Sequence, residues 1–374
     1  MAETLAKSTD RNLPKSPEQN DTRNATLVDV AKSAGVSLST AARVLRNSDY
    51  GVDPKLKEKV TIAAKAVGYI PNLVARRLRG GKQGVVGLVI GDMLDAHYGM
   101  IAESVTKRAE TAHSTFAIVC NMQRDPLLEI KYLRKLLEYR VDGIILASTS
   151  LSSELSEECA TAGIPVVLFN RTTERDAVSS VTTRNREGGK RIADFFVAGG
   201  HKSFGYIAGL ENSSTNRDRQ QGYVEGLAAH GFADVVIETG NYSRLDAEAA
   251  ARKMFSRADR PEALFVANDH MAVAVMDVAR HEFGLKIPED LSIIGYDDVG
   301  PARWTSYGIT SMSQPLKRMV ESTVDILMDQ IASGEIEAEH RILTGDLIVR
   351  TSARLPASGI IERDGQQIYR PREA

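Results

Sequence analysis

The 374-residue chain has very little cysteine, and its two cysteines lie far apart. Cys120 and Cys159 form no CxxC pair and no spacing typical of a metal site, so we expect free, at least partly buried thiols in a reducing compartment. The sequence also has no run that approaches about 18 apolar residues, the length at which a membrane-spanning helix is expected. A disulfide-stapled secreted domain and an integral membrane protein are therefore not expected.

Signals for secretion and for common cofactors are also missing. Residues 1–25 are polar without an apolar segment, so we expect a disordered extension of a cytoplasmic protein. The string GGKQG at 80–84 is not a phosphate-binding loop, because its first glycine has the wrong spacing and no Ser or Thr follows the lysine. No dinucleotide fingerprint is present either, and we expect no cofactor and no bound metal.

Charge is distributed unevenly along the chain. Residues 1–82 hold 15 of the 47 basic and 8 of the 49 acidic residues, a net charge of +7, which leaves −9 on the remainder and −2 overall. A basic N-terminal part on an acidic body is typical of a protein that presents one end to nucleic-acid phosphates.

The segment 26–46, TLVDVAKSAGVSLSTAARVLR, predicts a helix-turn-helix. Thr26 is the expected N-cap of the first helix, with Asp29 in the place of a capping-box acid. Gly35 supplies the turn, and Ser37 is expected to cap a second helix. The outward side chains of that helix, which could enter a major groove, are Leu38, Ser39, Thr40 and Arg43. An ordinary αα-hairpin is the alternative for this segment alone.

Two further helical segments follow. Asp53 and Pro54 are an expected N-cap and first helical residue, which opens a third helix over 55–67. The segment NLVARRLRGGK at 72–82 is too short to be a stable helix alone, so we expect it to fold only when docked and to act as a hinge.

From Val85 onward the sequence alternates apolar runs with helical patterns. Strands are expected at 85–90, 116–120, 143–147, 165–169, 204–209, 263–267 and 291–296, and helices at 98–112, 127–139, 185–198, 216–230 and 269–282. Runs without polar alternation indicate strands buried on both faces, as in a parallel α/β sheet. A break near 170–184 predicts two α/β lobes in tandem, with a late edge strand at 341–350. Ligands of such sheets bind beyond the carboxyl ends of the strands.

Together these strings resemble the lac repressor family of bacterial transcriptional regulators, over about residues 26–355. Beside the helix-turn-helix, the strings are GYIPN (68–72), REGGKRIADFF (186–196), AND (267–269), IIGYDD (293–298) and TSMSQP (310–315). The chain departs from the family pattern at Ala41 and Ala42, where valine and serine are usual. At Ala41 we expect a smaller contact with the core than valine would make. At Ala42 we expect the loss of the serine hydroxyl that commonly contacts a DNA phosphate.

The resemblance implies a domain order. A disordered extension (1–25) precedes an all-α helix-turn-helix head (26–71), and a hinge helix and linker (72–82) joins the head to a two-lobed, periplasmic-binding-protein-like α/β effector and dimerisation domain with parallel sheets (83–357). A flexible tail (358–374) without a leucine heptad follows, so we expect a homodimer that binds a near-palindromic DNA operator.

The resemblance also implies roles for individual residues. Leu38, Ser39 and Arg43 would read bases, with Arg43 able to fork onto guanine O6 and N7. Phosphate-positioning roles are implied for Thr26, Thr40 and Asn47. In the hinge, Leu78 would wedge into the minor groove with Arg79 beside it. Surface exposure alone, or lobe packing for Leu78, is the simpler alternative.

The cleft between the lobes is the expected effector site. The residues expected there are Asp95, His97, Tyr98, Asn170, Arg219, Tyr242, Asn268 and Asp297. Their acceptors, donors and aromatic faces suit a sugar or sugar derivative, and Arg219 could hold a carboxylate, a phosphate or vicinal hydroxyls. Lobe-bridging hydrogen bonds are the alternative role for each.

Two other functions, an enzyme and a secreted solute-binding protein, are less consistent with the sequence. For an enzyme, Asp297 and Asp298 could form a carboxylate pair, but adjacent residues on a strand point to opposite sides. His270, Asp277 and His281 lie along one helix with no partner motif, so a solvated face is favoured over a metal site. A secreted solute-binding protein would share the lobes but needs a signal peptide and no basic head. We therefore expect a regulator and no enzyme.

Overall fold

The computed structural model describes residues 25–45, 53–70, 82–147, 158–173 and 177–371. The chain divides into two compact units, residues 1–81 and 82–374, and each is described by itself. Most of the expected N-terminal extension and almost all of the expected hinge lie outside the described residues.

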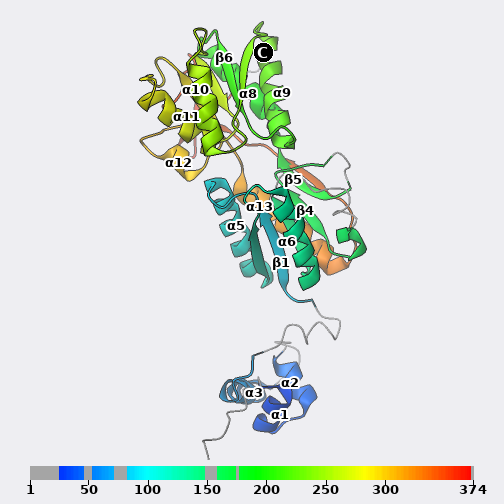
Figure 1. Ribbon diagram of the computed structural model, residues 1–374. Helices are drawn as coiled ribbons and strands as arrows, with labels where there is room; N and C mark the ends of the chain where they lie inside the picture. The colour runs from blue at the N-terminus through cyan, green and yellow to red at the C-terminus, as the bar shows by residue number, and fades with distance from the viewer. Residues whose placement is uncertain (1–24, 46–52, 71–81, 148–157, 174–176, 372–374) are drawn as a thin grey trace, which may run out of the picture. The chain divides into compact units, whose positions relative to one another are not determined.

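The N-terminal unit holds three short helices, drawn in blue in Figure 1. They are α1 (Leu27–Ala34), α2 (Leu38–Leu45) and α3 (Pro54–Ala66). The expected caps form: the Asp29 carboxylate accepts from the Thr26 N–H at 2.8 Å, and Gly35 ends α1 in the left-handed region. Small apolar side chains from all three helices, including Ala31, Ala41 and Ala63, make the core. Alanines allow these helices to cross closely, which suits a compact helix-turn-helix.

The first lobe of the second unit contains a six-stranded, fully parallel sheet in the order β11-β5-β4-β3-β1-β2. Its strands are β1 (Val85–Ile90), β2 (Phe116–Asn121), β3 (Gly143–Ala147), β4 (Val166–Phe169), β5 (Ser179–Thr183) and β11 (His340–Leu343). Helices α5 (Ala96–His113) and α13 (Leu316–Ser333) share one apolar cluster with the sheet, and α6 (Pro126–Tyr139) shares another. The sheet is thus covered on both faces, as its central apolar strands β1, β3 and β4 require.

The second lobe contains an eight-stranded sheet in the order β13-β14-β12-β10-β9-β8-β6-β7. The strands are β6 (Phe204–Ala208), β7 (Val235–Thr239), β8 (Ala263–Val266), β9 (Ser292–Asp297), β10 (Thr310–Ser313), β12 (Leu347–Ile348), β13 (Ile360–Arg363) and β14 (Gln366–Tyr369). The helices are α8 (Asn185–Ala198), α9 (Ser214–Ala229), α10 (Arg244–Phe255), α11 (Asp269–His281) and the short α12 (Gly300–Arg303). The sheet is parallel from β7 to β10, and β12, β13 and β14 pair antiparallel.

The expectation of two lobes in tandem is wrong in detail. The chain leaves the first lobe after β5, returns to it from β10 through α13, and leaves again between β11 and β12. Figure 1 shows this directly, because the orange α13 lies among the cyan elements of the first lobe. The expected single edge strand at 341–350 is therefore two strands in two sheets, and the expected break at 170–184 contains β5. Three crossings tie the lobes together.

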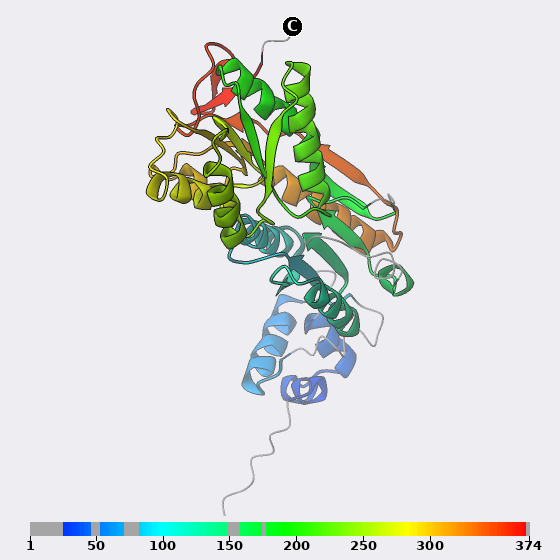
Figure 2. The same ribbon diagram turned by 45° about the horizontal axis from the view of Figure 1, so that its top comes forward.

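The expectation of a flexible tail is wrong for residues 360–369. This segment forms the β13–β14 hairpin, red in Figure 2, which pairs with β12 and extends the second sheet. Ile368 and Tyr369 are buried, and the Tyr369 ring meets Phe195 edge-to-face at 5.1 Å between centroids. The hairpin therefore covers an edge of the sheet and adds to the core of the second lobe.

Helices α8 and α9 approach so closely that glycine is required at their contact. A Cβ atom on Gly222 would lie 1.9 Å from the Arg186 carbonyl oxygen, and one on Gly189 would lie 2.3 Å from that of Arg219. These glycines belong to the strings REGGKR and QQGYVEG. This close contact fixes the position of α9 relative to α8. It therefore also fixes the position of the Arg219 side chain, which projects from α9 into the cleft.

Both cysteines are free, as expected, with Cys159 buried and Cys120 half-buried. Burial raises the pKa of the Cys159 thiol to about 11. Within the described ranges, no helix is both long and apolar enough to cross a membrane.

Replacing Gly222 with alanine should lower the free energy of unfolding by about 1–3 kcal/mol, because the added methyl group meets backbone that cannot yield without moving a helix. Urea unfolding of the full chain, followed by circular dichroism, measures this. Gly99→Ala is the matched control: a Cβ there meets nothing within 4 Å in α5, so stability should be unchanged or slightly raised. Equal effects of the two substitutions would contradict the close-packing account.

Candidate functional site

The side chains expected to read DNA lie on one exposed stretch of α2. Leu38 is 47% exposed, although it is a large apolar residue, and Ser39 and Arg43 are exposed as well. A single exposed leucine is unremarkable in itself. Leu38 and Ser39 lie in the first turn of the second helix, and Ser39 is four residues ahead of Arg43 on the same face, which matches the geometry in which such a helix enters a major groove. That these residues contact DNA stays a prediction.

The hydroxyl groups around the start of α2 and α1 are used within the head. The Thr40 N–H donates to the Ser37 hydroxyl at 3.1 Å, which confirms Ser37 as the cap, and the Thr40 hydroxyl lies 2.8 Å from it. The Thr26 hydroxyl donates to Asp29 at 2.6 Å. A DNA phosphate that contacts the Thr26 or Thr40 hydroxyl would therefore share that hydroxyl with its partner in the head, Asp29 or Ser37.

Other expectations for the head divide into two kinds. Ala41 and Ala42 are both buried, so both substitutions face the interior of the head. Of these, only Ala41 belongs to the three-helix core cluster. Asn47, Leu78 and Arg79 lie outside the described residues.

A cavity lies between the two lobes of the second unit, with about 390 Å³ of space that is partly open to solvent. Its lining contains all eight residues expected from the sequence: Asp95, His97, Tyr98, Asn170, Arg219, Tyr242, Asn268 and Asp297. They come from the carboxyl ends of strands or the first turns of helices in both lobes, except Arg219, which projects from the middle of α9. The sequence reasoning missed Ile101, Ala147, Phe169, Arg171 and Thr215, which also line the cavity.

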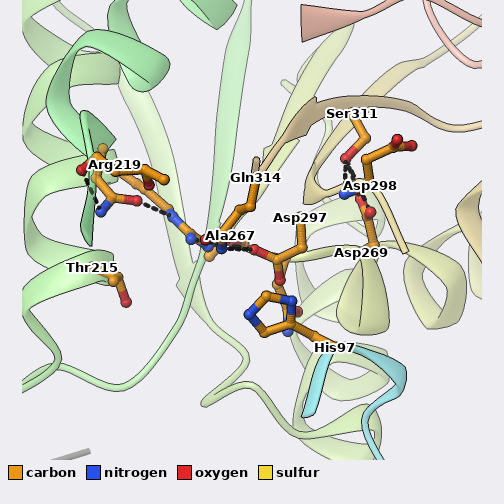
Figure 3. A network of polar contacts seen from close by, with 12 residues as sticks. His97, Thr215, Arg219, Ala267, Asp269, Asp297, Asp298, Ser311 and Gln314 are labelled. Carbon is orange, nitrogen blue, oxygen red and sulfur yellow. Dashed lines mark hydrogen bonds and ion pairs between the residues drawn. The ribbon is translucent and has the colours of Figure 1, made fainter. Parts of the chain in front are cut away.

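Arg219, like Asp95 in the same cavity, has only 2% of its surface exposed. Its guanidinium donates to Asn185 Oδ1 at 2.9 Å, to the Ala267 carbonyl at 2.6 Å and to Asp297 Oδ1 at 3.3 Å (Figure 3). It also lies 3.5 Å from the centre of the Tyr296 ring. Burial works against this charge, but Asp297 and nearby tyrosines outweigh it and raise the pKa of Arg219. Arg219 and Asp297 therefore form a buried ion pair without net charge, with further hydrogen bonds to Asn185, the Ala267 carbonyl and Gln314.

Asp95 and Asn268 join the two lobes across the cavity. Asp95 caps α5 by accepting from the His97 N–H at 3.0 Å, and Asn268 caps α11 by accepting from the Met271 N–H at 3.0 Å. The Asn268 amide donates to the other oxygen of Asp95 at 3.1 Å. Burial raises the pKa of Asp95, while nearby histidine charges oppose that shift. Two helix caps from different lobes thus share one hydrogen bond.

The two tyrosines of the cavity each rest on a glycine at a strand end. A Cβ on Gly91, after β1, would lie 2.7 Å from Tyr98, and one on Gly209, after β6, would lie 2.2 Å from Tyr242. Glycine at these positions lets the rings lie flat against the ends of the strands. The aromatic faces are therefore placed by the sheets themselves.

The Asp297–Asp298 turn is held from behind by Asp269, at the start of α11. Asp297 and Asp298 have φ values of 104° and 54°, a conformation that costs non-glycine residues free energy. The Asp269 carboxylate accepts from the Val299 N–H at 3.0 Å and from the Ser311 hydroxyl at 2.8 Å, and that hydroxyl accepts from the Asp298 N–H (Figure 3). This network aims Asp297 at the cavity.

The two adjacent aspartates serve different partners. Asp297 accepts from Arg219 and from Gln314 Nε2, the latter at 2.6 Å. Asp298 accepts from Arg350 at 2.6 Å and from Arg303 at 2.9 Å. They do not form a proton-sharing pair. Among the described residues, no group of three or more His, Cys, Asp or Glu side chains is placed to hold a metal ion.

The buried Asp269 predicts a pH dependence of stability. Burial, and next the charge of Asp297, raise the pKa of Asp269 well above its ordinary value. A raised folded pKa means that the unfolded chain loses this proton first, so stability falls as pH rises above about 3.9 and until the folded pKa is passed. Asp269→Asn keeps the neutral shape and removes the titration.

Thermal unfolding of the wild type and of Asp269→Asn between pH 4.5 and 8 measures this effect. The melting temperature of the wild type minus that of the variant should decrease as pH rises, because all other titrating groups are shared. Parallel curves would show that Asp269 does not titrate differently in the folded and unfolded chain.

The sequence of this chain is similar to those of known regulatory proteins. Residues 26–72 match the model of bacterial regulatory proteins of the lacI family, and residues 193–353 match a periplasmic binding protein-like domain. Catabolite control protein A of Priestia megaterium is 30% identical over 327 residues, which cover 85% of this chain and 98% of that protein.

Two solved structures share the fold. The lac repressor dimer bound to operator and the anti-inducer ONPF is 25% identical, with a TM-score of 0.77 over 88% of this chain and 99% of that one. The complex of the transcriptional regulator CelR with cellobiose is 29% identical, with a TM-score of 0.67 over 88% of this chain and 100% of that one. With a matching head and a 30% identical relative covered almost end to end, the chain belongs to the lacI family of bacterial regulatory proteins.

Proposed function

We propose that this protein is a sequence-specific DNA-binding regulator of transcription, most simply a repressor, whose affinity for its operator is set by a small-molecule effector. The effector is a sugar or sugar derivative and binds in the cleft between the lobes. The protein acts in the cytoplasm, as a homodimer, on a near-palindromic operator, with the hinge segments of two protomers meeting at its centre.

One observation carries the effector half of this proposal. Eight residues chosen from the sequence converge on one cavity, although they come from widely separated positions in the chain. The cavity offers two aromatic faces and a dense set of oxygen acceptors and amide donors, which is how proteins hold hydroxylated ligands. The cellobiose complex of a relative with the same fold supports this ligand class.

Control of DNA binding would follow from differential affinity. Asp95 and Asn268 bind each other only when the lobes are in the present arrangement. A ligand that prefers one lobe arrangement shifts the population of that arrangement, with a coupling free energy typically of about 1–3 kcal/mol. This coupling free energy corresponds to a factor by which the ligand changes the affinity for the operator. Affinity rises if the ligand prefers the lobe arrangement that binds DNA, and falls if it prefers the other.

Arg43→Ala should weaken binding to the operator by about 1–3 kcal/mol, roughly a 5- to 150-fold loss, because a bidentate contact to guanine is removed. The operator is first selected from random DNA with the full-length protein. Fluorescence anisotropy at about 0.15 M salt then gives affinities for the selected site and for unrelated DNA of equal length.

Lys65→Ala is the matched control, since it removes an exposed positive charge from α3 and leaves the proposed reading face of α2 intact. Arg43→Ala should lose affinity mainly for the selected site. Equal losses on both DNAs would mean that Arg43 contacts phosphate only, and failure of the wild type to enrich any sequence would refute the proposed function.

A further inference from the structure

The two arginines that line the cavity differ in how their charge is balanced. Arg219 is neutralised by Asp297. Arg171 is also buried, with 8% of its surface exposed, but among the described residues it forms no ion pair with a carboxylate. Its Nη1 donates to the hydroxyls of Ser213 and Thr215, which carry no charge. The Tyr242 ring, whose centre is 5.9 Å from the guanidinium, also faces this charge but supplies no counter-charge. A buried charge without a counter-charge is costly, so this end of the cavity suits a negative ligand group.

The partners of Arg171 lie at the N-terminus of α9. Ser213 caps this 16-residue helix and Thr215 is in its first turn. The first N–H groups of a helix have no partner within it and carry a partial positive charge. The structure therefore places a cationic guanidinium, from the first lobe, against a helix N-terminus that belongs to the second.

Two further side chains indicate that a polar ligand is expected here. Asn170, next to Arg171 in the chain, is 9% exposed, and its Oδ1 has no hydrogen-bond partner among the described residues. The Nε2 of His97, which is 8% exposed, is equally without one. Both residues line the cavity. Buried polar atoms are usually satisfied, and these two face the cavity, where a ligand can satisfy them. Asn170 Oδ1 only accepts, so it calls for a ligand donor such as a hydroxyl group.

We infer that the effector carries an oxyanion group, the carboxylate of a sugar acid or the phosphate of a sugar phosphate, which binds beside Arg171 at the N-terminus of α9. The hydroxylated part of the same ligand occupies the end of the cavity with Asp95, Asn268 and Asp297. This inference rests on the proposed function, because it names the class of effector for the same cleft. Arg171 then serves as the residue that selects charged over neutral sugars.

The test uses thermal shift and calorimetric titration of the full-length protein. The probes are inorganic phosphate and matched sets that each contain a neutral sugar, its uronic acid and its sugar phosphate, based on glucose and galactose, with ribose and ribose 5-phosphate added. Sodium chloride at equal ionic strength is the reference for every probe. The acid and phosphate arms distinguish the two sources of the oxyanion.

Phosphate or an anionic member of a set should raise the melting temperature of the wild type, with at least tenfold tighter binding than its neutral parent. Arg171→Gln should remove that tenfold difference. Arg217→Gln, which removes an exposed arginine from α9, should behave as the wild type. Arg171→Lys, which keeps the charge, should retain a shift of the same sign.

Three results would overturn the inference: shifts from neutral sugars only, anion shifts that persist in Arg171→Gln, or no shift from any probe. If Arg171→Gln does not fold, equal shifts by phosphate and chloride in the wild type and in Arg171→Lys would overturn it. Operator affinity measured with the best probe tests the proposed function separately. A neutral sugar that changes operator affinity would uphold regulation and refute the anionic effector.

Discussion

The buried ion pair between Arg219 and Asp297 is the interaction on which the cleft depends. Removing one partner of such a pair typically costs about 3–5 kcal/mol, because the other charge is left buried alone. The geometry that makes the pair possible is spread over the second lobe: glycines at the α8–α9 contact position Arg219, and the Asp269 network holds Asp297 in a strained turn. Gln314, in the segment that returns to the first lobe, donates to the same carboxylate oxygen. A ligand that binds Asp297 Oδ1 therefore competes with Gln314, which lies in a connection between the lobes.

Much of this arrangement could be predicted from the sequence, because parallel α/β sheets leave a strong local signal. Their strands are unbroken apolar runs, and polar residues just after such runs meet at one edge of the sheet. That rule places Asn170, Asn268 and Asp297 without any further information. Arg219 lies inside a helix, and its expected place came from the family resemblance. Arg171 follows Asn170 directly and could have been found by the same rule, as could Thr215 in the first turn of α9.

Strand β5 and the return of the chain to the first lobe could not be predicted, because both depend on contacts between residues far apart in the sequence. Strand β5, SSVTT, is polar yet buried, because its two serine hydroxyls bond to distant residues: Ser179 accepts from Gln330 at 2.9 Å, and Ser180 lies 2.9 Å from His340 Nδ1. Those partners belong to α13 and β11, whose return to the first lobe is itself a long-range feature. The C-terminal hairpin differs, since its signal was present. Asp364-Gly365, both with positive φ, is a turn pair that favours a two-residue hairpin loop.

The fold alone leaves the ligand open, because the same two lobes can surround many small molecules. What narrows the choice is the balance of satisfied and unsatisfied groups in the cavity. Arg219, Asp297, Asp95 and Asn268 are hydrogen-bonded to one another or to backbone, so they orient a ligand by exchanging partners with it. Arg171 lacks a counter-charge among the described residues, and Asn170 and His97 each keep an idle polar atom. The first group of residues is hydrogen-bonded with the cleft empty. Arg171 has hydroxyl partners but no counter-charge, so it indicates the charge of the ligand, whereas Asn170 Oδ1 needs a donor and indicates its hydroxyl groups.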